Sequence, residues 1–285
     1  MSRINQSMRS SLVGPLVSRL RSGLTVQDLN ALIKSLFSSG EQGALYVPKP
    51  TVNGAQALFQ DDAGTVAVTA DGDPVGLMLD QSGNGNHAIQ TVSGSRPVYR
   101  TDGTLHCLQF DGVDARLKTI ENIEIFGGAP RSVISAARVG STGGITVGWG
   151  IGARGQASDQ RVINQALAAR FWEIDPTTVN GPVATGSANV LSTLFYGNPA
   201  GPLDSEGVGT DARINGVYTP WGSYEYGGPS STVNTANTEL ELGQRSGSTL
   251  LTGRIYGVIV VSGALNGSNL NDAESYLANL AGVAL

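Results

Sequence analysis

From residue 44 onward, the hydrophobic positions fall in short runs of β-branched and aromatic residues. Asp-Gly and Asn-Gly pairs separate many of these runs, and their glycines supply the positive φ angle that tight hairpin turns require. Because no helical pattern intervenes, the runs predict an antiparallel sandwich or barrel rather than a parallel sheet. The predicted strands are 65–69, 105–110, 132–139, 144–149, 212–218, 239–242 and 253–261.

The run 253–261 differs from the others because both of its faces are apolar. Strict alternation places Ile255, Gly257 and Ile259 on one face, and the other face then carries Tyr256, Val258 and Val260. A strand that is apolar on both sides is typical of a central strand covered from above and below.

Helical periodicity occurs only near the two ends of the chain. Near the start, Thr25 and Asp28 resemble a capping box, and Ser38 to Gly40 end the helix. A shorter helix is expected between Ile4 and Leu12. A closing helix is expected over 270–281. The apolar stripe of the first main helix consists of Val26, Leu29, Leu32, Ile33 and Leu36.

Composition narrows the classes of function. Glycine accounts for 39 of the 285 residues and charged residues for 14 %, which argues against long solvent-exposed helices. The net charge of −5 makes a nucleic-acid surface unfavourable. The apolar runs have the length of strands, and Gly14–Pro15 interrupts the N-terminal one, so neither a membrane span nor a Sec-type signal is expected.

The first 40 residues are predicted to be a separate arm for anchoring and oligomerisation, followed by a sandwich over 41–285. A helix this short is marginal in water, so its stripe must dock on the sandwich, a sister chain or another protein. The first 22 residues are basic and contain no acid; their arginines are Arg3, Arg9, Arg19 and Arg21.

The candidate chemistry is sparse. Glu239 and Glu241 lie on one face of a strand, and Glu121 and Glu124 are three residues apart, but neither pair fits the carboxylate pattern of a retaining glycanase. Cys107 lies in an apolar run, as a buried core thiol would. The sequence therefore predicts no catalytic residues, no cofactor and no enzymatic activity.

Two sets of residues are weaker binding candidates. Carboxylate and amide oxygens on turns suit Ca²⁺, although turn formation alone also explains them; these residues are Asp80, Asn84, Asn86, Asp111 and Asp114. Aromatic rings in a polar, glycine-rich segment suit stacking on sugars, although core or intersubunit packing also explains them; these are Tyr218, Trp221, Tyr224 and Tyr226.

Four stretches resemble the concanavalin A-like or laminin G-like modules of tailed-phage structural proteins. They begin at Leu58-Phe59, at Gln81-Ser82-Gly83-Asn84-Gly85-Asn86-His87, at Leu108-Gln109-Phe110-Asp111-Gly112 and at Leu242-Gly243-Gln244-Arg245. The resemblance covers roughly 44–285, except that the middle, about 140–235, departs from it. It implies an all-β, antiparallel jelly-roll sandwich with an N-terminal helical arm and a C-terminal helix.

The same resemblance implies a non-enzymatic virion component, such as a decoration, fibre or tail-associated protein, assembled in the host cytoplasm. Its partners would be other virion proteins and copies of itself, with a homotrimer favoured. The alternative is an adhesin or receptor-binding protein that recognises glycans on the host surface.

Overall fold

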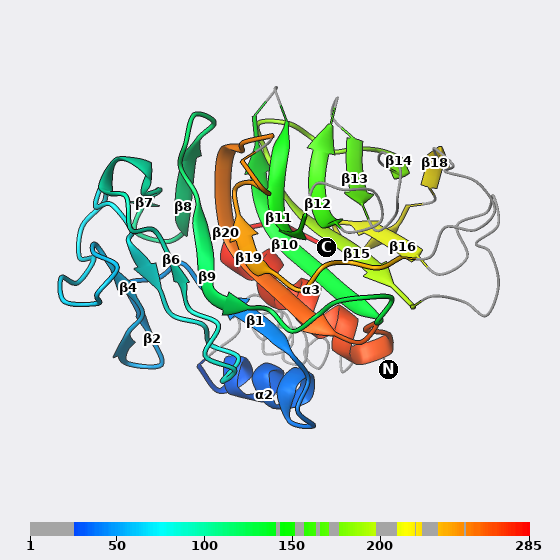
Figure 1. Ribbon diagram of the computed structural model, residues 1–285, viewed down its shortest axis with the longest axis horizontal. Helices are drawn as coiled ribbons and strands as arrows, with labels where there is room; N and C mark the ends of the chain where they lie inside the picture. Colours follow the sequence, from blue (N-terminus) through cyan, green and yellow to red (C-terminus); the bar gives the residue numbers. More distant parts are fainter. Residues whose placement is uncertain are drawn as a thin grey trace, which may run out of the picture.

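The fold is built from two large antiparallel sheets with helices on the outer side of one of them (Figure 1). It is seen in a computed structural model that describes residues 26–140, 143–151, 157–163, 166–170, 177–197, 210–219, 221–223, 233–247 and 249–285. The predicted β-sandwich with a helix near each end is confirmed. No described helix is both long and apolar enough to cross a membrane.

The first sheet has eight strands among the described residues, in the order β17-β16-β15-β10-β20-β8-β7, and β1 also pairs with β20. Its strands are β1 (Gly43–Tyr46), β7 (Val98–Thr101), β8 (His106–Asp111), β10 (Arg131–Val139), β15 (Ala188–Phe195), β16 (Thr210–Ile214), β17 (Val217–Tyr218) and β20 (Thr252–Ser262).

The second sheet has ten strands within the described ranges, in the order β18-β14-β13-β12-β11-β19-β9-β6-β5-β4. They are β4 (Leu58–Phe59), β5 (Leu77–Met78), β6 (Ala88–Ile89), β9 (Leu117–Asn122), β11 (Gly144–Gly150), β12 (Ala157–Ile163), β13 (Ala166–Arg170), β14 (Thr177–Pro182), β18 (Trp221–Ser223) and β19 (Glu239–Leu242). A small hairpin, β2 (Thr51–Val52) with β3 (Ala55–Gln56), and the 3₁₀ turn η1 (Ser93–Ser95) complete the β-rich part.

Strand β20 is the central strand of the first sheet, as its composition predicted. It pairs along one side with β10 and along the other with β8 and then β1. The faces differ from strict alternation, because the register with β10 shifts opposite Tyr256. Ile255, Val258 and Val260 therefore point into the sandwich, whereas Ile259 and Val261 pack on the opposite side.

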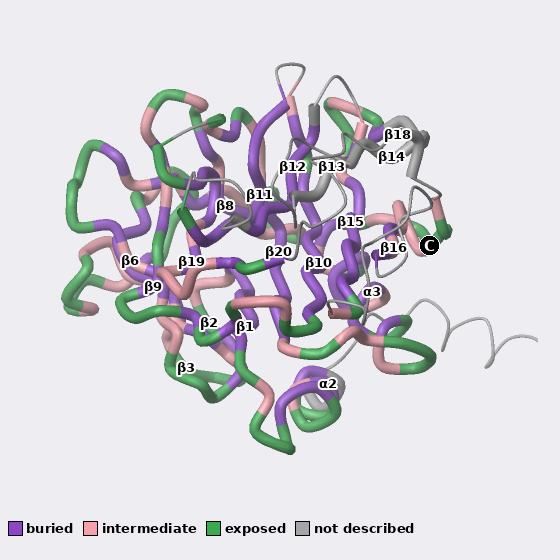
Figure 2. Tube along the Cα trace, turned by 45° about the vertical axis from the view of Figure 1, so that its right-hand side comes forward, coloured by how far each residue is buried: buried purple, intermediate pink, exposed green. Residues whose placement is uncertain are grey.

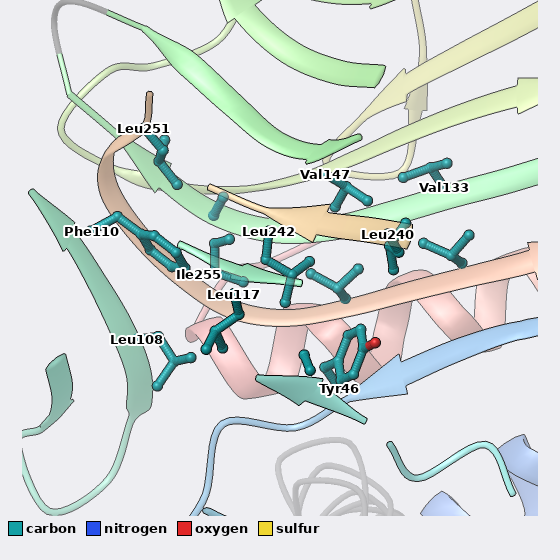
Figure 3. Packing of buried hydrophobic residues seen from close by; sticks show 14 of the residues in the cluster. Tyr46, Leu108, Phe110, Leu117, Val133, Val147, Leu240, Leu242, Leu251 and Ile255 are labelled. Carbon is teal, nitrogen blue, oxygen red and sulfur yellow. The ribbon is translucent and has the colours of Figure 1, made fainter. Parts of the chain in front are cut away.

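The main core fills the space between the sheets. Leu108, Phe110 and Ile255 of the first sheet pack with Leu117 and Leu242 of the second (Figure 3). Asp111–Gly112 turns the chain after β8, and the φ angle of +78° at Gly112 explains why glycine follows the aspartate there.

The helices α2 (Val26–Phe37) and α3 (Gly267–Ala281) cover the outer face of the first sheet. Gly257 of β20 allows this contact: a Cβ there would lie 2.7 Å from Leu277 and 2.9 Å from Leu280 of α3. Figure 2 shows buried residues on the side of α2 that faces the sandwich.

The stripe of α2 is occupied within the chain, which corrects the expectation that it seeks a partner. Leu29, Leu32 and Leu36 are buried and Ile33 is half-buried, all in the cluster that includes α3 and β20. The side chain of Val26 and residues 1–25, with Arg3, Arg9, Arg19 and Arg21, lie outside what the structure describes. A role of these arginines in assembly stays a prediction.

Other expectations had mixed outcomes. The residues expected to form a strand over 65–69 make only an isolated bridge, Phe59 with Ala67, so that strand was wrong. The expected run 212–218 divides into β16 and β17 because Asn215–Gly216 forms a hairpin turn. Strands β12 to β15 were not predicted at all.

We expect Leu36→Ala to lower the free energy of unfolding by about 2–5 kcal/mol, because it leaves a cavity in the helix layer. Lys34→Ala on the exposed side of α2 is the matched control, with an expected change below about 0.5 kcal/mol. Chemical denaturation of both variants measures the difference. Equal stability of the two variants would show that α2 is not docked on the sandwich.

Candidate functional site

The loop from Asp80 to His87 binds the first strand of the sandwich. The buried carboxylate of Asp80 accepts hydrogen bonds from Leu45 N (2.9 Å), Ser82 N (2.9 Å), Ser82 Oγ (2.6 Å) and Asn86 N (3.1 Å). The amides of Asn84 and Asn86 both donate to the carbonyl of Gly43, at 3.0 and 2.8 Å. These contacts are structural, because the bonds to Leu45 and Gly43 hold β1 against the loop and the others fix the loop itself.

The calcium candidates therefore divide into two places. Asp80, Asn84 and Asn86 lie in the loop beside β1, whereas Asp111 and Asp114 lie in the turn after β8. Asp111 Oδ1 accepts three backbone N–H groups of that turn, and Asp114 Oδ2 accepts Ser95 Oγ at 2.8 Å. Within the described ranges, no three His, Cys, Asp or Glu side chains gather as metal ligands would.

The aromatic candidates are only partly described. Tyr218 is 59 % exposed at the end of β17, an edge strand of the first sheet. Trp221 begins β18, an edge strand of the second sheet, and its backbone pairs with Val179. Tyr224 and Tyr226 lie outside the described residues, as does the side chain of Trp221. Their contact with a glycan stays a prediction.

A row of charged residues crosses the outer face of the second sheet and was not predicted. Gly148 of β11 pairs with Asp159 of β12 on one side and with Glu241 of β19 on the other. Glu241 in turn pairs with Lys118 of β9. Neighbouring Gln160, Leu240 and Leu242 point into the sandwich, so the row points away from it.

Asp159 is the most buried charge of this row. Its side chain is 0 % exposed, and its two oxygens lie 3.0 Å from Arg245 Nε and 3.5 Å from Arg161 Nε. The side chain of Arg245 lies over Gly148, where any added Cβ would lie 2.9 Å from that of Arg245. The missing side chain at Gly148 thus lets an arginine extend between the two acids of the row.

Glu241 is the accessible acid of the row. It is half-buried, and both of its oxygens accept the N–H of Ser246, at 3.2 and 3.0 Å. Glu239, on the same face, pairs with Lys118 at 3.2 Å. Its pKa is lowered by a backbone hydrogen bond and by Lys118. Gln244 is 5 % exposed, and its Oε1 has no hydrogen-bond donor among the described residues.

This arrangement offers hydroxyl-binding groups of both kinds on one face. Glu239 and Glu241, which are half-buried, accept hydrogen bonds and the exposed ammonium of Lys118 donates them, whereas Asp159 and Arg245 are buried beneath. Buried charges with specific partners are also typical of functional sites, although structural ion pairs share this property. Glu239 and Glu241 were noticed in the sequence, but Asp159 was not, because only strand register brings it into the row.

Comparisons with known proteins identify proteins of similar fold but assign the chain to no family. No family model and no curated protein matches the chain. Among solved structures, it is similar to a GH54 α-L-arabinofuranosidase soaked with a cyclic sulfate inhibitor, at 13 % identity and a TM-score of 0.60. An arabinofuranosidase complexed with arabinofuranosyl-α-1,2-xylobiose matches at 12 % identity and a TM-score of 0.58. Each alignment covers 87 % of this chain and 65 % of the other.

The receptor-binding domain of botulinum neurotoxin D also matches, at 10 % identity, a TM-score of 0.49 and coverage of 85 % and 53 %. The likenesses to the two arabinofuranosidases show the fold alone. They nevertheless contradict two expectations, the virion structural role and the absence of enzymatic activity, because the similar structures named above include glycoside hydrolases and no phage protein. The resemblance to phage modules rested on turn and strand motifs that mainly serve the fold.

We expect Asp80→Ala to destabilise the protein by about 2 kcal/mol or more, because it leaves buried N–H groups without their acceptor. Asp62→Ala, which removes a partly exposed ion pair with Arg96, is the control and should cost about 1 kcal/mol or less. Thermal unfolding measures both. The same assay with Ca²⁺ or a chelator should show no shift, since protein donors already occupy Asp80; a rise with Ca²⁺ would restore the calcium hypothesis.

Proposed function

We propose that the chain recognises carbohydrate through the outer face of its ten-stranded sheet, around Glu241, Arg245 and Asp159. The observation that carries this proposal is the charged row itself. Four neighbouring strands place hydrogen-bond acceptors and donors side by side on one face. Gly148, which lies between Asp159 and Glu241, leaves space for the side chain of Arg245.

The side chains of the row are held in fixed positions, which supports carbohydrate binding. The Ser246 N–H fixes Glu241, and Asp159 fixes the guanidinium of Arg245. Groups held in place lose little conformational entropy when they bind a ligand. Sugar hydroxyls need both donors and acceptors, which this face provides, and one arabinofuranosidase of similar fold is known in complex with arabinofuranosyl-α-1,2-xylobiose.

Hydrolysis is the second candidate, because the proteins of similar fold include glycoside hydrolases. Asp159 and Glu241 stand two strands apart, so their Cα atoms are separated by about 10 Å. Inverting glycosidases hold their two carboxyl groups about 6.5–9.5 Å apart, with room for a water molecule. Here the side chain of Arg245, which is paired with Asp159, lies between the two acids. Glu241, the more accessible acid, would face the substrate, while Asp159 would need access that its burial does not now give.

The test uses arabinofuranosyl-substituted xylo-oligosaccharides, a class of sugar bound by a protein of similar fold. We expect calorimetric binding by the wild-type chain and at least about tenfold weaker binding by Glu241→Gln, which removes the charge but keeps the shape; tenfold corresponds to about 1.4 kcal/mol. Glu121→Gln, an exposed acid of β9, is the matched control and should bind like the wild type.

Reducing-sugar release distinguishes the two candidates. Release by the wild type that Glu241→Gln abolishes would establish hydrolysis, whereas binding without release would leave recognition alone. The proposal is overturned if the wild-type chain binds none of a panel of neutral oligosaccharides, or if Glu241→Gln binds them as the wild type does.

A further inference from the structure

A second polar groove lies on the other side of the sandwich, on the outer face of the eight-stranded sheet. It consists of two adjoining cavities of about 320 and 260 Å³, which share Gln109 and Arg254 as lining residues. Tyr256 and Cys107 line the first, on the face of the sheet that the helices leave open at this end. Burial raises the pKa of Cys107 to about 11, which favours the neutral thiol at neutral pH.

The groove contains an arginine pair that the fold itself does not explain. Arg138 of β10 and Arg254 of β20 are directly opposite each other in the sheet register. Like charges directly opposite each other on adjacent strands destabilise a sheet. Among the described residues, no carboxylate forms an ion pair with either guanidinium, although the charge of Asp71 acts on Arg254 and offsets part of the repulsion.

The groups at the other end of the groove are engaged in fixed contacts. Asp71 pairs with Arg100 at 3.1 Å and accepts the N–H of Thr101 at 2.9 Å. Arg100 also donates to Gln109 Oε1 at 3.3 Å. Asp102 caps the following turn through Thr104 N and Leu105 N. Among the described residues, the groove therefore has a cationic end without an ion pair and a neutralised end with hydrogen-bond acceptors.

We propose that this groove binds an acidic saccharide, with the carboxylate of a uronic acid between Arg138 and Arg254 and its hydroxyl groups toward Gln109 and Asp71. Arginine forks match a carboxylate in geometry as well as in charge. The open, polar lining and the two adjoining cavities fit a short oligosaccharide, because a single ion would need only the arginine pair. This site lies on the opposite sheet from the proposed neutral-sugar site and does not depend on it.

The experiment titrates the intact protein with a trisaccharide of uronic acid and with the same trisaccharide after reduction of its carboxyl groups to alcohols. We expect binding of the acidic form, weaker binding at high salt, and at least tenfold weaker binding of the reduced form. Arg138→Gln and Arg254→Gln should each weaken binding of the acidic form at least tenfold. Arg116→Gln, which removes an arginine outside the groove, should stay within twofold of the wild type.

Two further readouts keep the outcome unambiguous. Without ligand at low ionic strength, each arginine variant should melt at the same temperature as the wild type or higher, because it removes repulsion; lower melting of both would overturn the argument. Inorganic sulfate and phosphate should displace the trisaccharide no better than chloride at equal ionic strength. If sulfate displaced the trisaccharide at the same concentration as a free uronic acid does, the groove would be a general oxyanion site instead.

The proposal would also be refuted if the wild-type protein did not bind the acidic trisaccharide, or if Arg138→Gln and Arg254→Gln bound it as tightly as the wild type. Glu241→Gln should bind the trisaccharide as the wild type does. That variant therefore separates a failure of this inference from a failure of the proposed function, since each site has its own disabling substitution.

Discussion

The structure depends on one strand that is buried on both faces. β20 directs Ile255, Val258 and Val260 into the sandwich and Ile259 and Val261 to the opposite side, and each such side chain is worth about 1.5–3 kcal/mol when fully buried. A second sheet covers only one of these faces. The other face requires the helix layer, and Gly257 lets α3 come close enough to provide it. The two helices thus complete the core, although they stand at opposite ends of the described chain.

How far the sequence predicted this arrangement depends on whether the signal is local. The apolar faces of β20, the stripe of α2 and the Asn-Gly and Asp-Gly turns are local, and the corresponding elements were predicted. The partner of the α2 stripe was not, because periodicity shows that a face must be covered but not by what. The bulge at Tyr256 and the isolated bridge at Ala67 depend on neighbouring strands, so the local sequence pattern does not predict them.

The functional candidates show the same limit more strongly. Asp159 joins Glu241 only because Gly148 pairs with both, and Arg138 meets Arg254 only because β10 lies beside β20. The two proposed sites therefore lie on opposite outer faces. The residues singled out in the sequence mostly serve turns instead: Asp80, Asn84 and Asn86 hold β1, and Asp111 closes the turn after β8. Two independent faces would allow one molecule to bridge two segments of a polysaccharide.

The position of β20 also has a consequence for how the chain acquires its structure. Gly43 pairs with Val261 and Arg131 with Ser262, so both β1 and β10 must wait for β20, which follows them at long distance in the sequence. Such long-range pairing makes folding slow, because the entropic cost of closing a long loop comes before the stabilising strand contacts form. During synthesis, β10 and β1 present unpaired edges until β20 leaves the ribosome, and unpaired edges are prone to aggregation. A strand that follows its two partners in the sequence is thus the one that joins the hairpins into a sandwich.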